Sequence, residues 1–151
     1  MNALIRSFKE EDTASVIGLW VACELVRPWN DATKDIQRKC LQNDELFLVA
    51  IVDEPSDDEP GDDELIIGTV MAGYEGHRGW INYLAVHPDY RNLELGRKLM
   101  QAAEEKLLSL GCPKINLQIR ADNAEVLQFY SALGFSDDHC ISLGKRLIHD
   151  D

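Results

Sequence analysis

The sequence lacks the usual marks of metal-binding, redox-active and membrane proteins. Its four cysteines (Cys23, Cys40, Cys112 and Cys140) lie far apart and form no C-x-x-C pair, so the common zinc-binding and thiol redox motifs are absent. The apolar run at residues 47–52 is much shorter than the ~20 residues of a membrane-spanning helix. No positively charged start followed by an apolar stretch opens the chain. We therefore expect a cytoplasmic protein with reduced thiols, no bound metal and no membrane partner.

Basic charge is also scarce. The formal net charge is -12, and residues 53–64 contain eight acidic side chains and no basic one. An anionic surface releases no counterions from a phosphate backbone, so the composition argues against a nucleic-acid partner and mildly favours cationic substrates. Pro55, Pro60 and Gly61 oppose regular structure in this acidic segment. We interpret residues 53–64 as an acidic hairpin loop, with docking of a basic partner as the alternative.

The length of 151 residues suits a single domain that spans residues 1–151. Apolar residues recur along most of the chain with the periodicity of helices or of strands. Helices are predicted near residues 11–24, 32–41, 95–110 and 123–133, and strands near residues 3–7, 45–52, 65–74, 80–86, 115–120 and 141–148.

One strand, loop and helix together form a candidate anion site. The strand ends at Val86, the loop covers residues 87–94, and the helix begins at Leu95. Main-chain N–H groups at a helix start lack partners within the helix, and the helix dipole adds roughly half a positive charge there. Arg91 and Arg97 add cationic side chains. This arrangement favours binding of a phosphate or a diphosphate.

Two sequence motifs resemble those of the GNAT superfamily of N-acetyltransferases. The stretch LAVHPDYRNLELGRKLM (residues 84–100) is similar to the acyl-CoA-binding motif of that family, whose pattern falls on Arg91, Glu94 and Gly96. Arg91 and Gly96 fit the pattern, whereas Glu94 stands where the family has glycine. The stretch NAEVLQFYSALGF (residues 123–135) resembles the second signature, and residues 112–123 are similar to the small bacterial YpeA-type members.

The resemblance implies the α/β fold of that family, with a central mixed β-sheet of about six to seven strands flanked by about four helices. It also implies an enzyme that transfers the acetyl group of acetyl-CoA, its co-substrate, to a primary amine by direct attack. Two central strands splay apart in the family and leave main-chain groups for the pantetheine arm. The residues expected to bind acetyl-CoA are Leu84, Ala85, Val86, Arg91, Asn92, Leu93, Glu94, Leu95, Gly96, Arg97, Asn123 and Tyr130.

Tyr130 is the candidate catalytic acid that the resemblance implies. Attack on a thioester expels a thiolate, which a phenol can protonate. The alternative is that Tyr130 only packs beside Phe129 and Phe135 in the core.

The attacking amine must also lose a proton, which requires a base or a chain of water molecules. Some relatives have a glutamate at the position of Gln118, and an amide cannot act as a base. Glu75 is our first substitute, and His77 and water held by Asn82 or Tyr83 are others.

Three questions stay open from the sequence. Glu94 and Gln118 motivate the alternative of a non-catalytic acyl-CoA-binding or sensing module with the same fold. The acceptor can be a small molecule or a protein amine. A homodimer formed through the last predicted strand is one option for the assembly.

Overall fold

The computed structural model describes residues 3–53 and 64–151, in which five strands form one sheet with the order β1-β2-β3-β4-β5. Neighbouring strands are antiparallel except β4 and β5, which are parallel. Parallel neighbours need a crossover connection, and α3 supplies it. The strands are β1 (Leu4–Ser7), β2 (Phe47–Asp53), β3 (Glu64–Tyr74), β4 (Gly79–Val86) and β5 (Ile115–Leu117).

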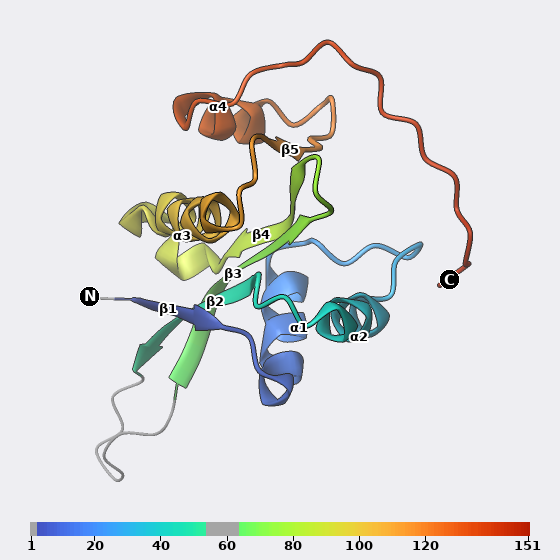
Figure 1. The fold of residues 1–151 in the computed structure, drawn as a ribbon. Coiled ribbons are helices and arrows are strands. Elements are labelled where there is room, and N and C mark those ends of the chain that lie inside the picture. The colour runs from blue at the N-terminus through green and yellow to red at the C-terminus, as the bar shows by residue number, and fades with distance from the viewer. Residues whose placement is uncertain (1–2, 54–63) are drawn as a thin grey trace, which may run out of the picture.

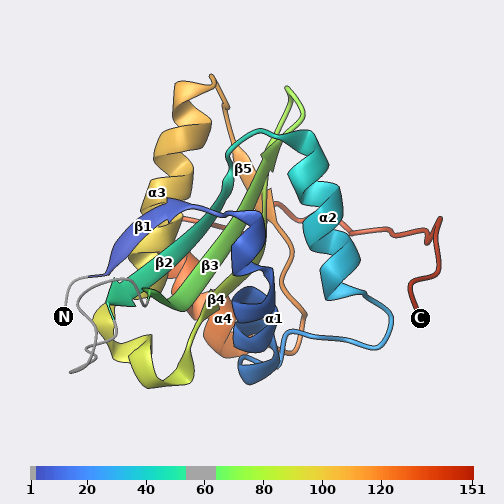
Figure 2. The ribbon, with the colours of Figure 1, turned by 90° about the horizontal axis from the view of Figure 1, so that it is seen from below.

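Helices cover both faces of the sheet (Figure 1), and α2 and α3 lie on opposite sides of it (Figure 2). The described residues contain four α-helices and two short 3₁₀ helices. These are α1 (Thr13–Ala22), α2 (Ala32–Gln42), α3 (Leu95–Ser109), α4 (Ala124–Ala132), η1 (Glu10–Asp12) and η2 (Pro88–Leu93).

The continuous apolar run of β2 is explained by this double cover. Side chains alternate across a strand, so Leu48 and Ala50 face α3 while Phe47 and Val49 face α1 and α2. All four residues are buried. The sheet therefore has one hydrophobic core on each face.

Local signals define the ends of α2, which forms one wall of the candidate site. Asp31 accepts a hydrogen bond from the main-chain N–H of Lys34 at 3.0 Å and thereby caps the first turn. Asn43 has a φ of 47°, and this left-handed conformation ends the helix. Ile36 lies buried on the face that α2 turns toward the sheet.

Most predicted elements are confirmed, and the sheet is smaller than expected. The α/β class and the four helices agree with the prediction, but the described sheet has five strands rather than six to seven. Part of the loop predicted at residues 87–94 is the 3₁₀ helix η2. The acidic loop predicted at residues 53–64 lies outside the described residues, apart from its two ends.

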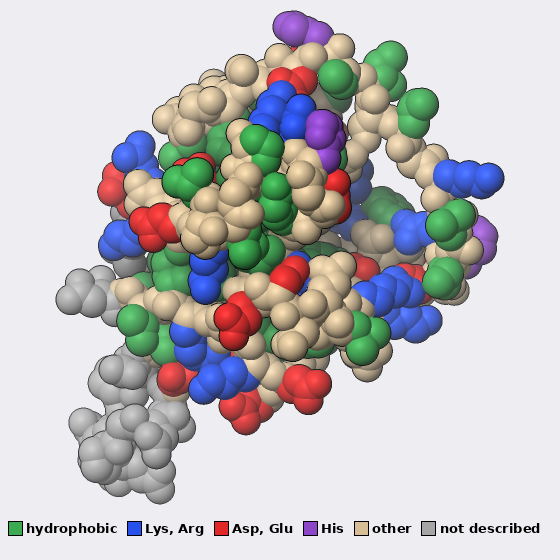
Figure 3. Space-filling model, in the orientation of Figure 1, with side chains coloured by type: hydrophobic (Ala, Val, Ile, Leu, Met, Phe, Trp, Pro, Cys, Tyr) green, Lys and Arg blue, Asp and Glu red, His purple; other side chains and the backbone are tan. Residues whose placement is uncertain are grey.

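The last strand, predicted at residues 141–148, is wrong. The segment after α4 arches away from the body of the molecule, and its end returns to α2 (Figures 1 and 3). A strand needs a neighbouring main chain to bond to. Side chains instead link this segment to β5 and to the residue after it: Asn116 donates to Asp138 at 2.8 Å, and Gln118 donates to Ser142. Alternation of apolar residues alone does not supply a main-chain partner.

Candidate active site

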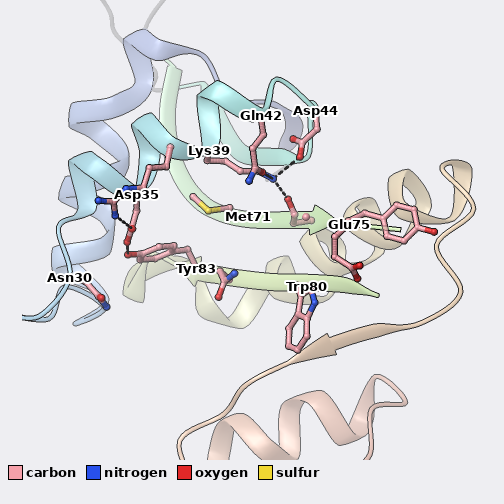
Figure 4. Close-up of a pocket in the computed structure, with 14 residues that line it drawn as sticks. Asn30, Asp35, Lys39, Gln42, Asp44, Met71, Glu75, Trp80 and Tyr83 are labelled. Carbon is pink, nitrogen blue, oxygen red and sulfur yellow. Dashed lines mark hydrogen bonds and ion pairs between the residues drawn. The ribbon is translucent and has the colours of Figure 1, made fainter. Parts of the chain in front are cut away.

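A cleft of about 900 Å³ opens between α2 and the adjoining parts of β3 and β4 (Figure 4). One wall is the polar face of α2, which contributes Asp35 and Lys39. The floor comes from the sheet, with Met71 on β3 and Tyr83 on β4, and Glu75 follows β3. The cleft therefore combines carboxylates, a phenol and an ammonium group on a rigid frame.

Lys39 connects the wall of the cleft to its floor. Its ammonium group donates to Asp44 at 2.8 Å, to Gln42 at 3.0 Å and to the main-chain carbonyl of Ala72. Only 8% of Lys39 is exposed. A buried charge is stable only when it is paired and hydrogen-bonded. We conclude that this side chain fixes α2 against β3.

The floor of the cleft contains a β-bulge in β4. The register between β3 and β4 shifts between Thr69 and Met71, because Thr69 lies opposite Ala85 but Met71 lies opposite Asn82. Tyr83, within this interval, has a φ of 51° in the left-handed region. Bulges re-aim side chains and interrupt strand pairing. Here the bulge lies at the boundary between the cleft and the end of β4.

Beyond the bulge, β4 has no strand partner on its β5 side among the described residues. The pairing of β4 with β5 ends at Ile81 and Leu117, although β4 continues to Val86. Leu84 and Val86 are half-buried and pack on the core that includes α3. The end of β4 is therefore free of strand pairing on this side, at the place where the sequence resemblance predicts that two central strands splay apart.

The start of α3 has the form expected of an anion site. Glu94 precedes the helix with φ 55° and ψ 25°, and its side chain caps none of the first N–H groups. Arg97 is exposed on the first turn, and Arg91 donates from Nε to the carbonyl of Val86 at 3.2 Å. Uncapped N–H groups beside cationic side chains are suited to phosphate oxygens.

The two sequence motifs meet in space. A Cβ atom on Gly96, at the start of α3, would lie 3.1 Å from Cζ of Phe129 on α4. It would also lie 3.9 Å from a methyl group of Val86. The glycine of the first motif thus leaves room for an aromatic ring of the second.

Tyr130 is buried beside this contact. Its ring packs edge-on against Phe129 at 5.1 Å and against Phe135 at 5.5 Å. Desolvation raises the pKa of Tyr130 to about 12. Its hydroxyl has no hydrogen-bond partner among the described residues. The packing that the sequence offered as an alternative is present, and a role as an acid stays a prediction.

The structure separates the other predicted site residues. Glu75 lines the cleft, but its carboxylate accepts from the main-chain N–H groups of His77 at 3.1 Å and of Arg78 at 2.5 Å. Asn123 is exposed and caps α4 through a 3.3 Å bond from the N–H of Val126. Asn92 and Leu93 end η2, and Leu95 begins α3.

Leu95 is fully buried, so its side chain belongs to the core and only its main chain is available at the start of α3.

The sequence analysis missed two side chains of the site and one contact between strands. Asp35, on the first turn of α2, gave no signal beyond its helical position. Lys39 gave one, because a lysine three residues after the buried Ile36 falls on the face of the helix that packs against the sheet. The contact of Thr69 with Tyr83 joins residues on different strands, and no local pattern predicts it.

In residues 3–53 and 64–151, no group of three or more His, Cys, Asp or Glu side chains is arranged to hold a metal ion. No helix within the same ranges is long and apolar enough to span a bilayer.

The chain is also similar in sequence to known proteins. A family model described as the acetyltransferase (GNAT) family matches residues 4–135. An acetyltransferase of Pectobacterium atrosepticum is 47% identical over 146 residues, which cover 97% of this chain and 96% of that protein.

Solved structures share the fold at low sequence identity. The NatC complex bound to Gag peptide and CoA has a TM-score of 0.70 at 22% identity, over 88% of this chain and 84% of that chain. AAC(6')-Iy in complex with the bisubstrate analogue CoA-S-monomethyl-acetylneamine has a TM-score of 0.70 at 15% identity, over 98% of this chain and 100% of that chain. With the family match over residues 4–135, we conclude that the chain belongs to the acetyltransferase (GNAT) family.

Proposed function

We propose that this acetyltransferase transfers the acetyl group of acetyl-CoA to a primary amine by direct attack. The observation that carries the proposal is the bulge in β4, where the cleft meets the unpaired end of the strand. Tyr83 lines the cleft, and the next residue, Leu84, begins the stretch of β4 that packs toward α3. An acceptor in the cleft and a thioester along β4 would therefore meet at one point of the chain.

The described residues fit acetyl-CoA, which supplies the activated acetyl group. Main-chain groups of Leu84, Ala85 and Val86 would bind the pantetheine arm, because β5 does not pair with this stretch. Main-chain N–H groups of residues 91–97 would bind the diphosphate at the start of α3. The CoA-containing complexes of two proteins with the same fold support this assignment.

Tyr130 would protonate the departing thiolate. It belongs to the same buried cluster as Leu84 and Val86, along which the pantetheine arm would lie. Because burial raises its pKa to about 12, the phenol keeps its proton at neutral pH, as an acid must. Asn123 stays a predicted contact of the pantetheine region, and Glu75 stays a predicted base.

The acceptor is expected to be a cation before it reacts. Asp35, Asp44 and Glu75 contribute carboxylates to the cleft, and an ammonium group is drawn to such a surface. Both small-molecule and protein amines fit this description.

The proposal is tested with the purified protein, acetyl-CoA and a panel of primary amines, by measuring the thiol that is released. Calorimetry with CoA at low salt measures binding separately. We expect both thiol release and binding. Binding without release for any amine would favour an acyl-CoA-sensing module, and absence of binding would contradict the proposed site.

We also propose a homodimer and a cytoplasmic location. The segment after α4 exposes Ile141, Leu143 and Leu147 by 84–91%, and contact with a second copy would cover them. All four cysteines carry free thiols, which suits a reducing compartment. Light scattering tests the dimer, and replacing Leu143 by Asp should yield a monomer. A wild-type monomer would contradict this assembly.

A further inference from the structure

The amine that attacks a thioester must give up a proton, and three carboxylates line the cleft. Two of them already stabilise their own segments. Asp44 pairs with Lys39 at 2.8 Å and accepts from the N–H of Leu46 at 3.0 Å. Glu75 accepts from two main-chain N–H groups of the turn that follows it. Proton uptake by either group would weaken these interactions.

Asp35 is engaged differently. Its Oδ2 atom accepts a 2.5 Å hydrogen bond from the hydroxyl group of Tyr83, a neighbour across the cleft (Figure 4). Its Oδ1 atom lies 3.6 Å from Arg38, and 28% of the Asp35 side chain is exposed. The phenol therefore links this carboxylate on α2 to the floor of the cleft.

Tyr83 is held firmly in that position. Its ring stacks on Trp20 with a centroid separation of 3.8 Å and an interplanar angle of 9°. Its main-chain carbonyl accepts from the hydroxyl of Thr69 at 2.8 Å. Desolvation and the hydrogen bond to Asp35 raise the pKa of Tyr83 well above its usual range. A phenol that stays protonated accepts a proton only if it passes its own to a neighbour.

We propose that Tyr83 takes the proton of the attacking amine while its own proton moves to Asp35. This inference rests on the proposed acetyl transfer and names the base for it. Tyr83 would be a catalytic residue, and Asp35, which acts through it, a positioning residue and the final proton acceptor. Glu75 would then serve to shape the turn.

The ammonium group of the acceptor first loses one proton to solvent. The lone pair that this frees on nitrogen forms a bond to the carbonyl carbon, and the π electrons move to the oxygen. The N–H proton passes to Oη of Tyr83 as the Tyr83 proton passes to Oδ2 of Asp35. The carbonyl then re-forms, the carbon–sulfur bond breaks, and the thiolate takes the proton of Tyr130. Asp35 returns its proton to solvent, and Tyr130 regains one.

Other charged groups face this pair and belong to its pH behaviour. Asp31 and Arg38 lie on or beside α2, and Asp150 of the C-terminal segment makes a bidentate pair with Arg38 at 2.9 and 3.1 Å. Arg38 interacts with both Asp35 and Asp150. Its positive charge is therefore divided between two carboxylates, and only part of it acts on Asp35. Variants at Tyr83 and Asp35 should leave that outer pair in place.

The test compares Y83F, D35N and the double variant with E75Q, which also removes one negative charge from the cleft. The quantities are kcat, KM for acetyl-CoA, and the dependence of kcat on pH, with CoA binding and thermal unfolding measured in parallel. Phenylalanine keeps the ring that stacks on Trp20, and asparagine can still accept from Tyr83, so both variants should fold.

We expect Y83F and D35N each to lower kcat by about 100-fold, a typical contribution of a general base, with CoA affinity retained. The double variant should be no slower than the slower single variant, because the two groups act as a unit. In the wild type, we expect kcat to fall on the acidic side of its pH profile. This acidic limb should be lost in D35N and kept in E75Q. A purely structural role would not move this limb.

Two results would overturn the inference. One is a wild-type pH profile with near wild-type kcat in both Y83F and D35N. The other is loss of the acidic limb in E75Q alone. A wild-type protein that binds CoA but releases no thiol contradicts the proposed function itself, and the inference is then rejected with it.

Discussion

The hydroxyl group of Thr69 donates a 2.8 Å hydrogen bond to the main-chain carbonyl of Tyr83, from β3 to the bulge in β4. The same hydroxyl accepts from Nε1 of Trp20 at 2.9 Å, so it serves as donor and acceptor at once. Thr69 is completely buried, and Tyr83 has a left-handed main chain. A local conformation of this kind persists only where its surroundings hold it in place.

Replacing Thr69 by Val should destabilise the protein. Valine has nearly the same shape but no hydroxyl, so Nε1 of Trp20 and the carbonyl of Tyr83 both lose this partner. Each unsatisfied buried group costs about 1–3 kcal/mol, and we expect the free energy of unfolding to fall by about 2 kcal/mol or more. Urea denaturation measures it. Thr69→Ser keeps the hydroxyl and is the control; equal stability of the two variants would argue against the role of the hydroxyl.

Gly96 should not tolerate a methyl group, although most helical glycines do. An added Cβ atom would lie 3.1 Å and 3.3 Å from two ring atoms of Phe129, and overpacking costs about 1–3 kcal/mol. Gly18 in α1 has no atom within 4 Å of the same position, so Gly18→Ala should stabilise the protein by about 0.5–1 kcal/mol. Opposite shifts of the urea midpoint are expected, and shifts of the same sign would contradict the packing argument.

The role of Gly96 illustrates what the sequence could predict. The motif correctly located the start of α3, because helix ends and apolar periodicity are local signals. It could not reveal that Phe129, 33 positions later in the chain, occupies the space beside the glycine. The motif therefore predicted where the segment lies and missed one of the contacts that explain its glycine.

The sequence could not predict the bulge in β4 or the course of the C-terminal segment, and the physical reason is the same for both. Tyr83 takes its conformation from contacts with Thr69 and Trp20, which lie 14 and 63 positions away in the chain. At residues 141–148, alternating apolar residues met the requirement for a strand, but strand formation also needs a main-chain partner. Long-range contacts of this kind leave no periodic pattern in the segment itself.

Glu94 should weaken the proposed diphosphate site. A non-glycine residue in the left-handed conformation costs roughly 1–2 kcal/mol, and Glu94 has a φ of 55°. Its carboxylate would also repel phosphate groups at the start of α3. We expect Glu94→Gly to raise stability and to tighten acetyl-CoA binding in calorimetry at low salt. Glu94→Gln removes only the charge; an affinity that neither variant improves would mean that this side chain does not hinder the site.

Acid should destabilise the protein through Asp12. Burial by itself would raise the pKa of this carboxyl, but hydrogen bonds from Arg6 and from the main chain of Lys9 lower it below 3.8. A lowered pKa in the folded state adds stability above the unfolded pKa, and this stability is lost as pH falls through the folded pKa. The pair with Arg6, at 2.8 Å, is therefore at full strength at neutral pH.

Asp12→Asn should accordingly lower the free energy of unfolding by about 2 kcal/mol at neutral pH, a typical cost for a hydrogen bond to a charged group. The difference from wild type should shrink as pH falls below about 4. Urea denaturation at several pH values measures this, with the exposed Asp122→Asn as the control. A difference that stays constant with pH would contradict the linkage.

Tyr130→Phe should separate the two roles that the residue can have. Phenylalanine fills the same space between Phe129 and Phe135, so packing and stability should be retained. Loss of the phenolic proton should lower kcat about 100-fold, a usual contribution of a general acid, while KM for acetyl-CoA is kept. Phe135→Leu is the converse control, because it disturbs the packing and leaves the phenol in place. If Tyr130→Phe keeps full turnover and Phe135→Leu loses it, Tyr130 acts only by packing, because the phenol then contributes nothing that its ring does not.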